Sequence, residues 1–192
     1  GTYTLQDALT ATNNLTITNG TLDTKSGSNY GITVGNNYSN SGTFTARSGT
    51  VTFNATATGK TITTGGSSFY DLTFNGVGGG WTLQDNTTVS DVLTITNGTL
   101  SGGSVTLTLS GTTGTPFTNA GTFTPSTSTV TYTGNNGAGN TTVANVTYYN
   151  LTLNNGSETY VLAANTTANN NLTITAGTLD VVSGQNYSLS VG

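Results

Sequence analysis

Short segments in which two apolar residues flank one hydroxyl residue recur along the chain about every 20 residues. Such a triplet puts its apolar side chains on one face of an extended strand and its hydroxyl on the other, which is typical of half-buried strands. The first series has ten triplets: Leu15–Ile17, Ile32–Val34, Val51–Phe53, Leu72–Phe74, Leu93–Ile95, Leu107–Leu109, Val130–Tyr132, Leu151–Leu153, Leu172–Ile174 and Leu189–Val191. A second series of apolar positions interleaves with it: Leu5, Leu22, Phe44, Ile62, Leu83, Leu100, Phe123, Val143, Leu162 and Leu179.

Both series lie inside a longer repeat of 78 to 79 residues. The eight residues 15–22 return at 93–100, and they return again at 172–179 with Ala in place of one Asn. A fixed period of this kind predicts a stacked architecture in which each repeat packs on its neighbours. We therefore expect one continuous unit over residues 1–192, with copies at about 2–79 and 80–158 and a partial copy at 159–192.

The two interleaved series predict an all-β fold, a single-stranded β-solenoid (parallel β-helix) of about ten coils. Each coil has about 20 residues, and four coils make one long repeat. At roughly 4.8 Å per coil, the rod is on the order of 45–50 Å long. No segment shows apolar residues at helical spacing.

Tandem antiparallel sandwiches are the rival architecture, because Asn19-Gly20 and Asn97-Gly98 resemble two-residue hairpin turns. The third copy has Ala176 before its Gly, and Ala tolerates poorly the positive φ that a type I′ turn requires at both central positions. A β-arc with one left-handed Gly accommodates Asn-Gly and Ala-Gly equally, which favours the solenoid.

Composition excludes several function classes. Only 5% of the residues are charged, and the three cations Lys25, Arg47 and Lys60 are too few to bind a nucleic-acid backbone or an anionic membrane surface. No apolar run is long enough to span a bilayer as a helix. We expect neither nucleic acid nor membrane insertion.

Catalytic chemistry has few candidate groups in this chain. Without His or Cys, zinc or copper sites and His-dependent nucleophiles are excluded, so we expect no cofactor, no metal and no enzyme activity. Asp85 and Asp91 are the acids closest to a carboxylate pair of the glycosidase kind. The acids vary between repeat copies, however, and Asn13 and Asn170 stand where the second copy has Asp91. They behave as exchangeable polar surface residues.

The central hydroxyls of the first series are expected to stack one per coil on the outside of the solenoid. The ladder suits exposed strand positions, where neighbouring Thr side chains interact along the sheet. An ice-binding face is the functional alternative, but the next outward column is interrupted by Gly and Asn. The predicted ladder is Thr16, Thr33, Thr52, Thr73, Thr94, Thr108, Thr131, Thr152 and Thr173, continued by Ser190.

Aromatic residues recur in phase with the strands. Alternation along the strands points most of them into the core. Phe69 and Tyr148 fall on the opposite phase, so we expect them to be exposed and to be the candidate contact aromatics for a ligand such as a glycan.

The segments Ser41–Phe44, Gly49–Phe53 and Phe69–Phe74 match Ala120–Phe123, Ser128–Tyr132 and Tyr148–Leu153 in the next copy. These motifs resemble the Thr/Asn/Gly-rich β-solenoid repeats of large secreted bacterial surface proteins of the adhesin and filamentous-haemagglutinin-like kind. The resemblance covers nearly the whole chain. It implies an extracellular, cell-surface stalk, shaft or fibre role, and it implies no catalytic residues.

Neither end of the sequence shows the polar capping coil, Pro or charged edge that protects strand edges. We expect both ends to be covered by more solenoid, either further repeats of the same polypeptide or copies of the chain stacked end to end. The expected function is a structural rod of a surface filament, stalk or adhesin shaft. A ligand-binding solenoid face, for glycans or ice, is the alternative.

Overall fold

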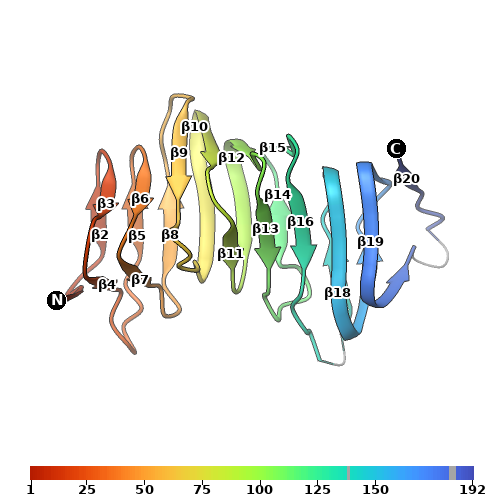
Figure 1. Ribbon diagram of the computed structural model, residues 1–192, viewed down its shortest axis with the longest axis horizontal. Coiled ribbons are helices and arrows are strands. Elements are labelled where there is room, and N and C mark those ends of the chain that lie inside the picture. The colour runs from red at the N-terminus through yellow and green to blue at the C-terminus, as the bar shows by residue number, and fades with distance from the viewer. Residues whose placement is uncertain (138, 182–184) are drawn as a thin grey trace.

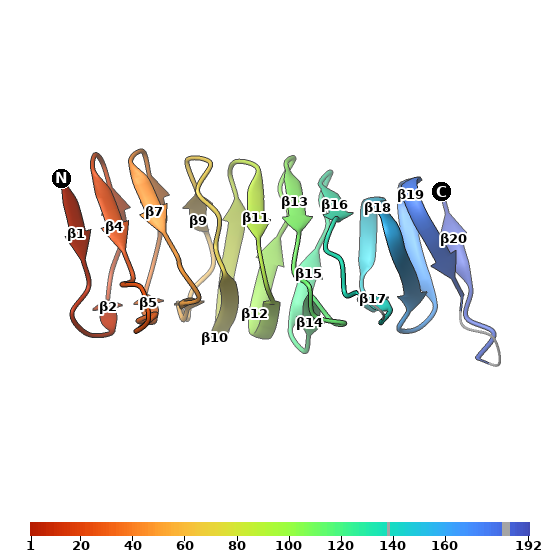
Figure 2. The ribbon, with the colours of Figure 1, turned by 90° about the horizontal axis from the view of Figure 1, so that it is seen from below.

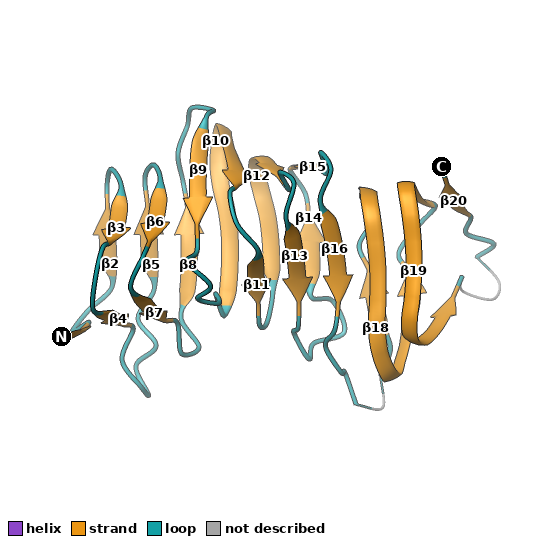
Figure 3. Cartoon of the chain, in the orientation of Figure 1, coloured by secondary structure: helices purple, strands orange, loops and turns teal. Residues whose placement is uncertain are grey.

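The computed structural model describes residues 1–137, 139–181 and 185–192. In this part of the chain the named strands pair in parallel and no helix occurs. The chain winds as a β-solenoid of about nine turns with about 21 residues per turn, so the predicted fold class is confirmed. Figure 1 shows the turns following one another along one axis, with the two termini at opposite ends. Strands alternate with short loops at the corners (Figure 3).

Each turn contributes three strand segments, so the solenoid has three faces, which we call A, B and C in the order in which the chain visits them. Face A carries β1 (Thr2–Thr4), β4 (Thr21–Asp23), β7 (Thr43–Thr45), β11 (Thr87–Val89), β13 (Thr106–Leu109), β16 (Thr129–Tyr132) and the middle parts of β18 (Thr147–Leu162) and β19 (Thr166–Asp180). Between β7 and β11, Phe69 extends this face through a parallel bridge to Val89. Figure 2 shows the six short strands of face A following one another along the rod.

The other two faces share the long strands that run around a corner. Face B carries β2 (Leu9–Ala11), β5 (Ile32–Val34), β8 (Thr50–Phe53), the first parts of β10 (Asp71–Leu83) and β12 (Leu93–Ser101), β14 (Phe117–Asn119), β17 (Thr141–Val143) and the last parts of β18 and β19. Face C carries β3 (Leu15–Ile17), β6 (Tyr38–Asn40), β9 (Lys60–Thr63), the last parts of β10 and β12, β15 (Thr122–Thr124), the first parts of β18 and β19, and β20 (Leu189–Val191).

The long repeat does not hold a whole number of turns. From the triplet in β3 on face C to its matching triplet in β12 on face B, the chain passes three complete turns and two further strands. The third copy of this triplet, Leu172–Ile174, lies on face A beside Leu151–Leu153. Successive repeat copies are therefore rotated by about one third of a turn around the solenoid axis.

This rotation corrects the prediction that four coils make one repeat and that the first series forms one column. Leu15 pairs with Tyr38 instead of Ile32, and Leu93 pairs with Phe117 instead of Leu107. In both cases the expected partner lies fewer residues along the chain than the turn length of about 21, so the chain has not yet returned to the same face.

The core is a continuous stack of buried apolar side chains inside the three faces. In the middle turns the core is rich in aromatic side chains. The rings of Phe53 and Phe74 are stacked, with their centroids 5.4 Å apart. The next copy has Tyr132 and Tyr148 where the first has Phe53 and Phe69. Their buried hydroxyls lie 2.9 Å apart, and the Tyr148 hydroxyl donates to the carbonyl of Ala144 at 2.9 Å. The extra polar atoms are thus satisfied inside the core, as burial requires.

The Asn-Gly and Ala-Gly corners confirm the arc over the hairpin. Gly20, Gly98 and Gly177 occupy the same repeat position, and all three have positive φ, at 83°, 84° and 98°. The preceding residues Asn19, Asn97 and Ala176 do not have a positive φ. A type I′ hairpin needs two left-handed residues and antiparallel strands, and this corner has one left-handed residue and parallel strands.

Candidate functional site

The outward hydroxyls form the most regular surface feature of the rod. On face B one Thr lies in register on each of six consecutive turns. In the last pair along the chain, the Thr118 hydroxyl donates a hydrogen bond to the Thr94 hydroxyl at 3.1 Å. This ladder contains four of the predicted residues and two that the triplet search missed, in the order Thr10, Thr33, Thr52, Thr73, Thr94 and Thr118.

A second, separate ladder lies on face A in the other half of the rod. Four predicted residues belong to it, and it begins one turn earlier than the triplets indicate, in the order Thr88, Thr108, Thr131, Thr152 and Thr173. Thr16 belongs to neither ladder, because it lies on face C beside Ser39. The missed residues sit in the less regular triplets Leu9–Ala11, Thr87–Val89 and Phe117–Asn119, which carry Ala, Thr or Asn at an inward position.

The prediction that Phe69 and Tyr148 are exposed was wrong. Both side chains are buried, and the Phe69 ring lies 5.4 Å from the ring of Tyr38. Inward and outward positions alternate only within one straight strand. Phe69 pairs on face A, and the chain rounds a corner before Leu72 pairs on face B. For Tyr148 the pairing of β18 with β19 shifts register between Tyr148 and Asn150, which resets the alternation in the same way.

Asp85 and Asp23 both bind groups of a neighbouring turn. Both carboxylate oxygens of Asp85 accept backbone N–H groups one turn away, from Thr64 at 2.8 Å and Gly65 at 2.7 Å. The guanidinium of Arg47 donates to both oxygens of Asp23 at 3.0 and 2.8 Å and lowers the pKa of that carboxyl. Among the described residues, no group of three His, Cys, Asp or Glu side chains could hold a metal ion.

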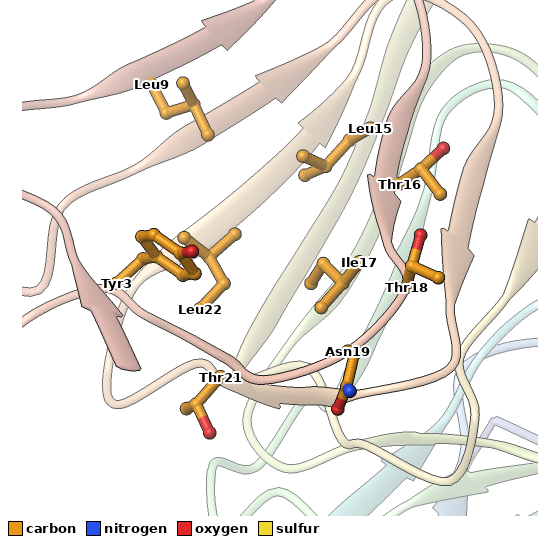
Figure 4. A pocket seen from close by; sticks show the side chains of 9 residues that line it. All are labelled: Tyr3, Leu9, Leu15, Thr16, Ile17, Thr18, Asn19, Thr21 and Leu22. Carbon is orange, nitrogen blue, oxygen red and sulfur yellow. The ribbon is translucent and has the colours of Figure 1, made fainter. Parts of the chain in front are cut away.

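The N-terminal end of the rod opens directly into the core. An opening of about 370 Å³ lies there, and Tyr3, Leu9, Leu15, Ile17 and Leu22 line its apolar part. Figure 4 shows these side chains around one mouth, contributed by β1, β2, β3 and β4. Tyr3 is 71% exposed, whereas Trp81 and Tyr160, which occupy the same repeat position further along, are 1% and 0% exposed.

The C-terminal end exposes apolar side chains as well. Ile174 is 46% exposed, whereas its repeat equivalents Ile17 and Ile95 are 7% and 0% exposed. Val191 is 50% exposed, whereas Val34, at the same position of the first copy, is fully buried. Some positions that are buried within the rod are therefore exposed at its ends, Tyr3 at one end and Ile174 and Val191 at the other, whereas Ile17 at the N-terminal end stays buried. Of the five large apolar side chains that are exposed in the described chain, four lie at these two ends, and the fifth, Val77 in β10, lies in the middle of the rod.

No described helix is long and apolar enough to cross a membrane. A scan against protein-family models and searches of curated proteins and of solved structures return no match to this chain.

Proposed function

We propose that this chain is a structural rod segment of an extracellular surface filament, stalk or adhesin shaft, in which further solenoid turns cover both ends. The observation that carries the proposal is the contrast between equivalent positions: the same side chains are bare at the ends and buried in the middle turns. A surface that repeats the interior of the rod fits another turn of the same kind.

The magnitude of this exposure supports the proposal. Burying an apolar side chain completely stabilises by about 1.5–3 kcal/mol. Covering the exposed parts of Tyr3, Ile174, Val181 and Val191 would therefore contribute roughly 5 kcal/mol at one junction, before the cost of association. The free strand edges add unpaired backbone groups, which readily accept another strand.

The composition supports an extracellular setting, because Lys is scarce and Thr, Asn and Gly are abundant, which favours a secreted surface protein. Since the chain has no Cys, backbone pairing and core packing must stabilise an extracellular form without disulfides. The resemblance of the repeats to those of secreted surface proteins points the same way. Copies of the chain or further repeats are the proposed end-on partners.

Face B favours one alternative function, a ligand-binding surface. Its six Thr residues in register form a regular array that could meet ice or a glycan. An ice-recrystallisation assay and a glycan array test this alternative, with Thr52→Lys and Thr73→Lys as variants that interrupt the ladder. Activity that these substitutions remove would establish the alternative, and no activity in either assay would exclude it.

Electron microscopy and light scattering of the full chain test the rod proposal. We expect particles that lengthen with concentration in steps of one rod, because four of the five exposed large apolar side chains of the described residues lie at the ends. Tyr3→Lys places a charge in the N-terminal opening and should keep the chain monomeric. Thr52→Lys places the same charge on face B and should leave assembly unchanged. Monomers at high concentration for the unmodified chain, with no gain in stability when further repeats are fused to its ends, would contradict the proposal.

A further inference from the structure

We propose that Glu158 and Thr141 are ligands of a calcium ion that binds inside the solenoid, at the corner between faces A and B where β18 packs against β17. Both side chains are buried, with exposed fractions of 2% and 1%. Glu158 lies in β18, and Thr141 is the first residue of β17. The site lies within the stacked turns, so the inference is independent of the rod function and of whatever covers the two ends.

Strand pairing places the two side chains on the same side of their strands. Thr141 pairs with Tyr160 in the parallel ladder of β17 and β18, which lie side by side in Figure 2. Glu158 stands two residues before Tyr160, and all three side chains are buried, so they point into the interior. Glu158 Oε2 accepts the backbone N–H of Asn136 at 2.8 Å. Because Asn136 precedes Thr141 in the same turn, the Glu158 carboxylate reaches toward the turn that carries Thr141.

Each of the two side chains has a buried oxygen that finds no hydrogen-bond partner among the described residues, Glu158 Oε1 and Thr141 Oγ1. Such atoms are rare, because buried polar groups are normally hydrogen-bonded. Glu158 also lacks a countercharge, since the three cations of the chain, Lys25, Arg47 and Lys60, lie more than four turns away, roughly 20 Å along the rod. A buried carboxylate without a countercharge is costly.

A bound cation accounts for both observations together. It would supply the missing charge and would contact both unpartnered oxygens. A proton on Glu158 would remove the charge but would leave the Thr141 hydroxyl without a partner. A water molecule would contact the oxygens but would leave the charge uncompensated.

The preceding repeat copy has an apolar corner at the same place. Gly79 and Ile62 stand there at the positions of the two proposed ligands. A Cβ at Gly79 would collide with the carbonyl oxygen of Ala55 and would lie 2.5 Å from the ring of Trp81, so that corner has no room for a side chain. In the next copy the residues that match Ala55 and Trp81 are Gly and the smaller Tyr. The exchanges that bring polar oxygens into the corner therefore accompany exchanges to smaller residues around it.

The ligand types select Ca²⁺ among the common metal ions. Ca²⁺ accepts carboxylate, amide and backbone carbonyl oxygens in a flexible geometry, whereas Mg²⁺ demands a nearly ideal octahedron and gives up its water reluctantly. The corner segment offers further neutral oxygens in Asn135, Asn136 and Asn140, and the preceding copy has no Asn at these positions. The expectation of no metal rested on the missing His and Cys, which Ca²⁺ does not need.

A single carboxylate predicts weak binding. The dissociation constant should be about 10⁻⁴–10⁻³ M, which is the range of extracellular calcium modules. One carboxylate with neutral oxygens also differs from a group of three His, Cys, Asp or Glu side chains, which is absent from the described residues.

Thermal unfolding and terbium luminescence of the full chain test the site. In about 10 mM Ca²⁺ the melting temperature should rise by about 4–7 °C above its value in KCl of equal ionic strength, and by much less in Mg²⁺. Tb³⁺ binds the same oxygen ligands and emits when an excited Tyr lies close to it. Tyr132, Tyr148 and Tyr160 are buried in the neighbouring turns, so we expect sensitised emission that added Ca²⁺ displaces.

Three variants assign the response to this corner. Glu158→Gln keeps the shape and removes the charge, so it should abolish both responses and should melt no lower than the unmodified chain without Ca²⁺. Thr141→Ile restores the residue of the preceding copy and should weaken Ca²⁺ binding about tenfold, since one ligand is lost. Asp7→Asn removes an exposed carboxylate far from the site and should leave both responses unchanged. Circular dichroism of each variant confirms that it is folded.

Two results would overturn the inference. The first is a melting temperature that is the same in Ca²⁺ and KCl, with no displaceable Tb³⁺ emission. In that case a proton or a water molecule fills the space, and Glu158→Gln should raise the melting temperature whether or not Ca²⁺ is present. The second is a full response in Glu158→Gln, which would mean that the ion binds elsewhere on the chain.

Discussion

Replacing one Ile at its three repeat positions measures how the core changes from the middle to the ends of the rod. Ile17, Ile95 and Ile174 share the local sequence Leu-Thr-Ile, and they are 7%, 0% and 46% exposed. Because the chemical change to Ala is identical at the three positions, the difference in the free energy of unfolding reports only the surroundings.

The expected magnitudes follow from burial. Ile→Ala removes three carbon groups, which is worth about 2.4 kcal/mol of transfer free energy when the side chain is fully buried. Ile95→Ala also leaves a closed cavity, so its total loss is about 3–4 kcal/mol. Ile174→Ala removes a half-exposed side chain and leaves no closed cavity, so its loss is about 1 kcal/mol. Ile17 lines the N-terminal opening, so the loss for Ile17→Ala should fall between the losses for Ile174→Ala and Ile95→Ala, at about 2–3 kcal/mol.

Equilibrium unfolding in urea measures these losses through far-UV circular dichroism and the fluorescence of Trp81, which is the single Trp and is buried. At low protein concentration Ile95→Ala should shift the transition about three times as far as Ile174→Ala. If copies dock end to end, the loss for Ile174→Ala should grow with concentration, because docking buries that side chain. Equal losses at the two positions at low concentration would refute the reasoning, since the turns would then be equally well packed.

Three further predictions concern the corners, the buried tyrosines and the ion pair. Gly98→Ala should lower the free energy of unfolding by about 2–4 kcal/mol, because Ala would have to adopt a left-handed φ and its Cβ would lie 2.7 and 2.8 Å from two carbonyl oxygens. Gly59 also has a left-handed φ but has open space around it, so Gly59→Ala should cost only about 1 kcal/mol. Burial raises the pKa of Tyr132 to about 12, above the value near 10 in an unfolded chain. The contribution of this group to stability is therefore fully present below pH 10 and is lost as the pH rises toward 12. The free energy of unfolding should fall less steeply over this range in Tyr132→Phe. The lowered pKa of Asp23 means that its contribution is lost as the pH falls through that pKa; Arg47→Ala should raise the pKa in a carboxylate titration by NMR, and an unchanged pKa would contradict the pairing.

The sequence was sufficient to predict the fold class, because the alternation within each triplet shows which side chains face the core and which face solvent. In Leu-Thr-Ile the inward and outward sides are evident, and the spacing near 20 residues excludes pairing between immediate neighbours. The arc at Gly98 was also predictable, because Ala176 at the equivalent corner excludes a second left-handed residue.

Corners limited the prediction of surface residues. Phe69 and Leu72 are three residues apart but belong to different faces, and the loss of alternation between them comes from the corner that tertiary packing imposes. The break of the Thr ladder has the same origin. Thr94 and Thr108 stand in matching triplets, yet only the turn length of about 21 residues decides that they lie on different faces. Both open ends were predictable in kind from the missing caps, but the side chains that they expose required the structure.

The one-third rotation of successive copies has a consequence for how such rods change length. Gain or loss of a repeat by unequal recombination would alter the length by about 18 Å, the height of three and two-thirds turns. It would also swing everything beyond the junction through about 120° around the axis, so a distal domain would face a new direction. Only changes in multiples of three repeats preserve the azimuth. Rods whose tip must point a fixed way should therefore vary in length by threes, whereas rods that merely span a distance are free to vary by ones.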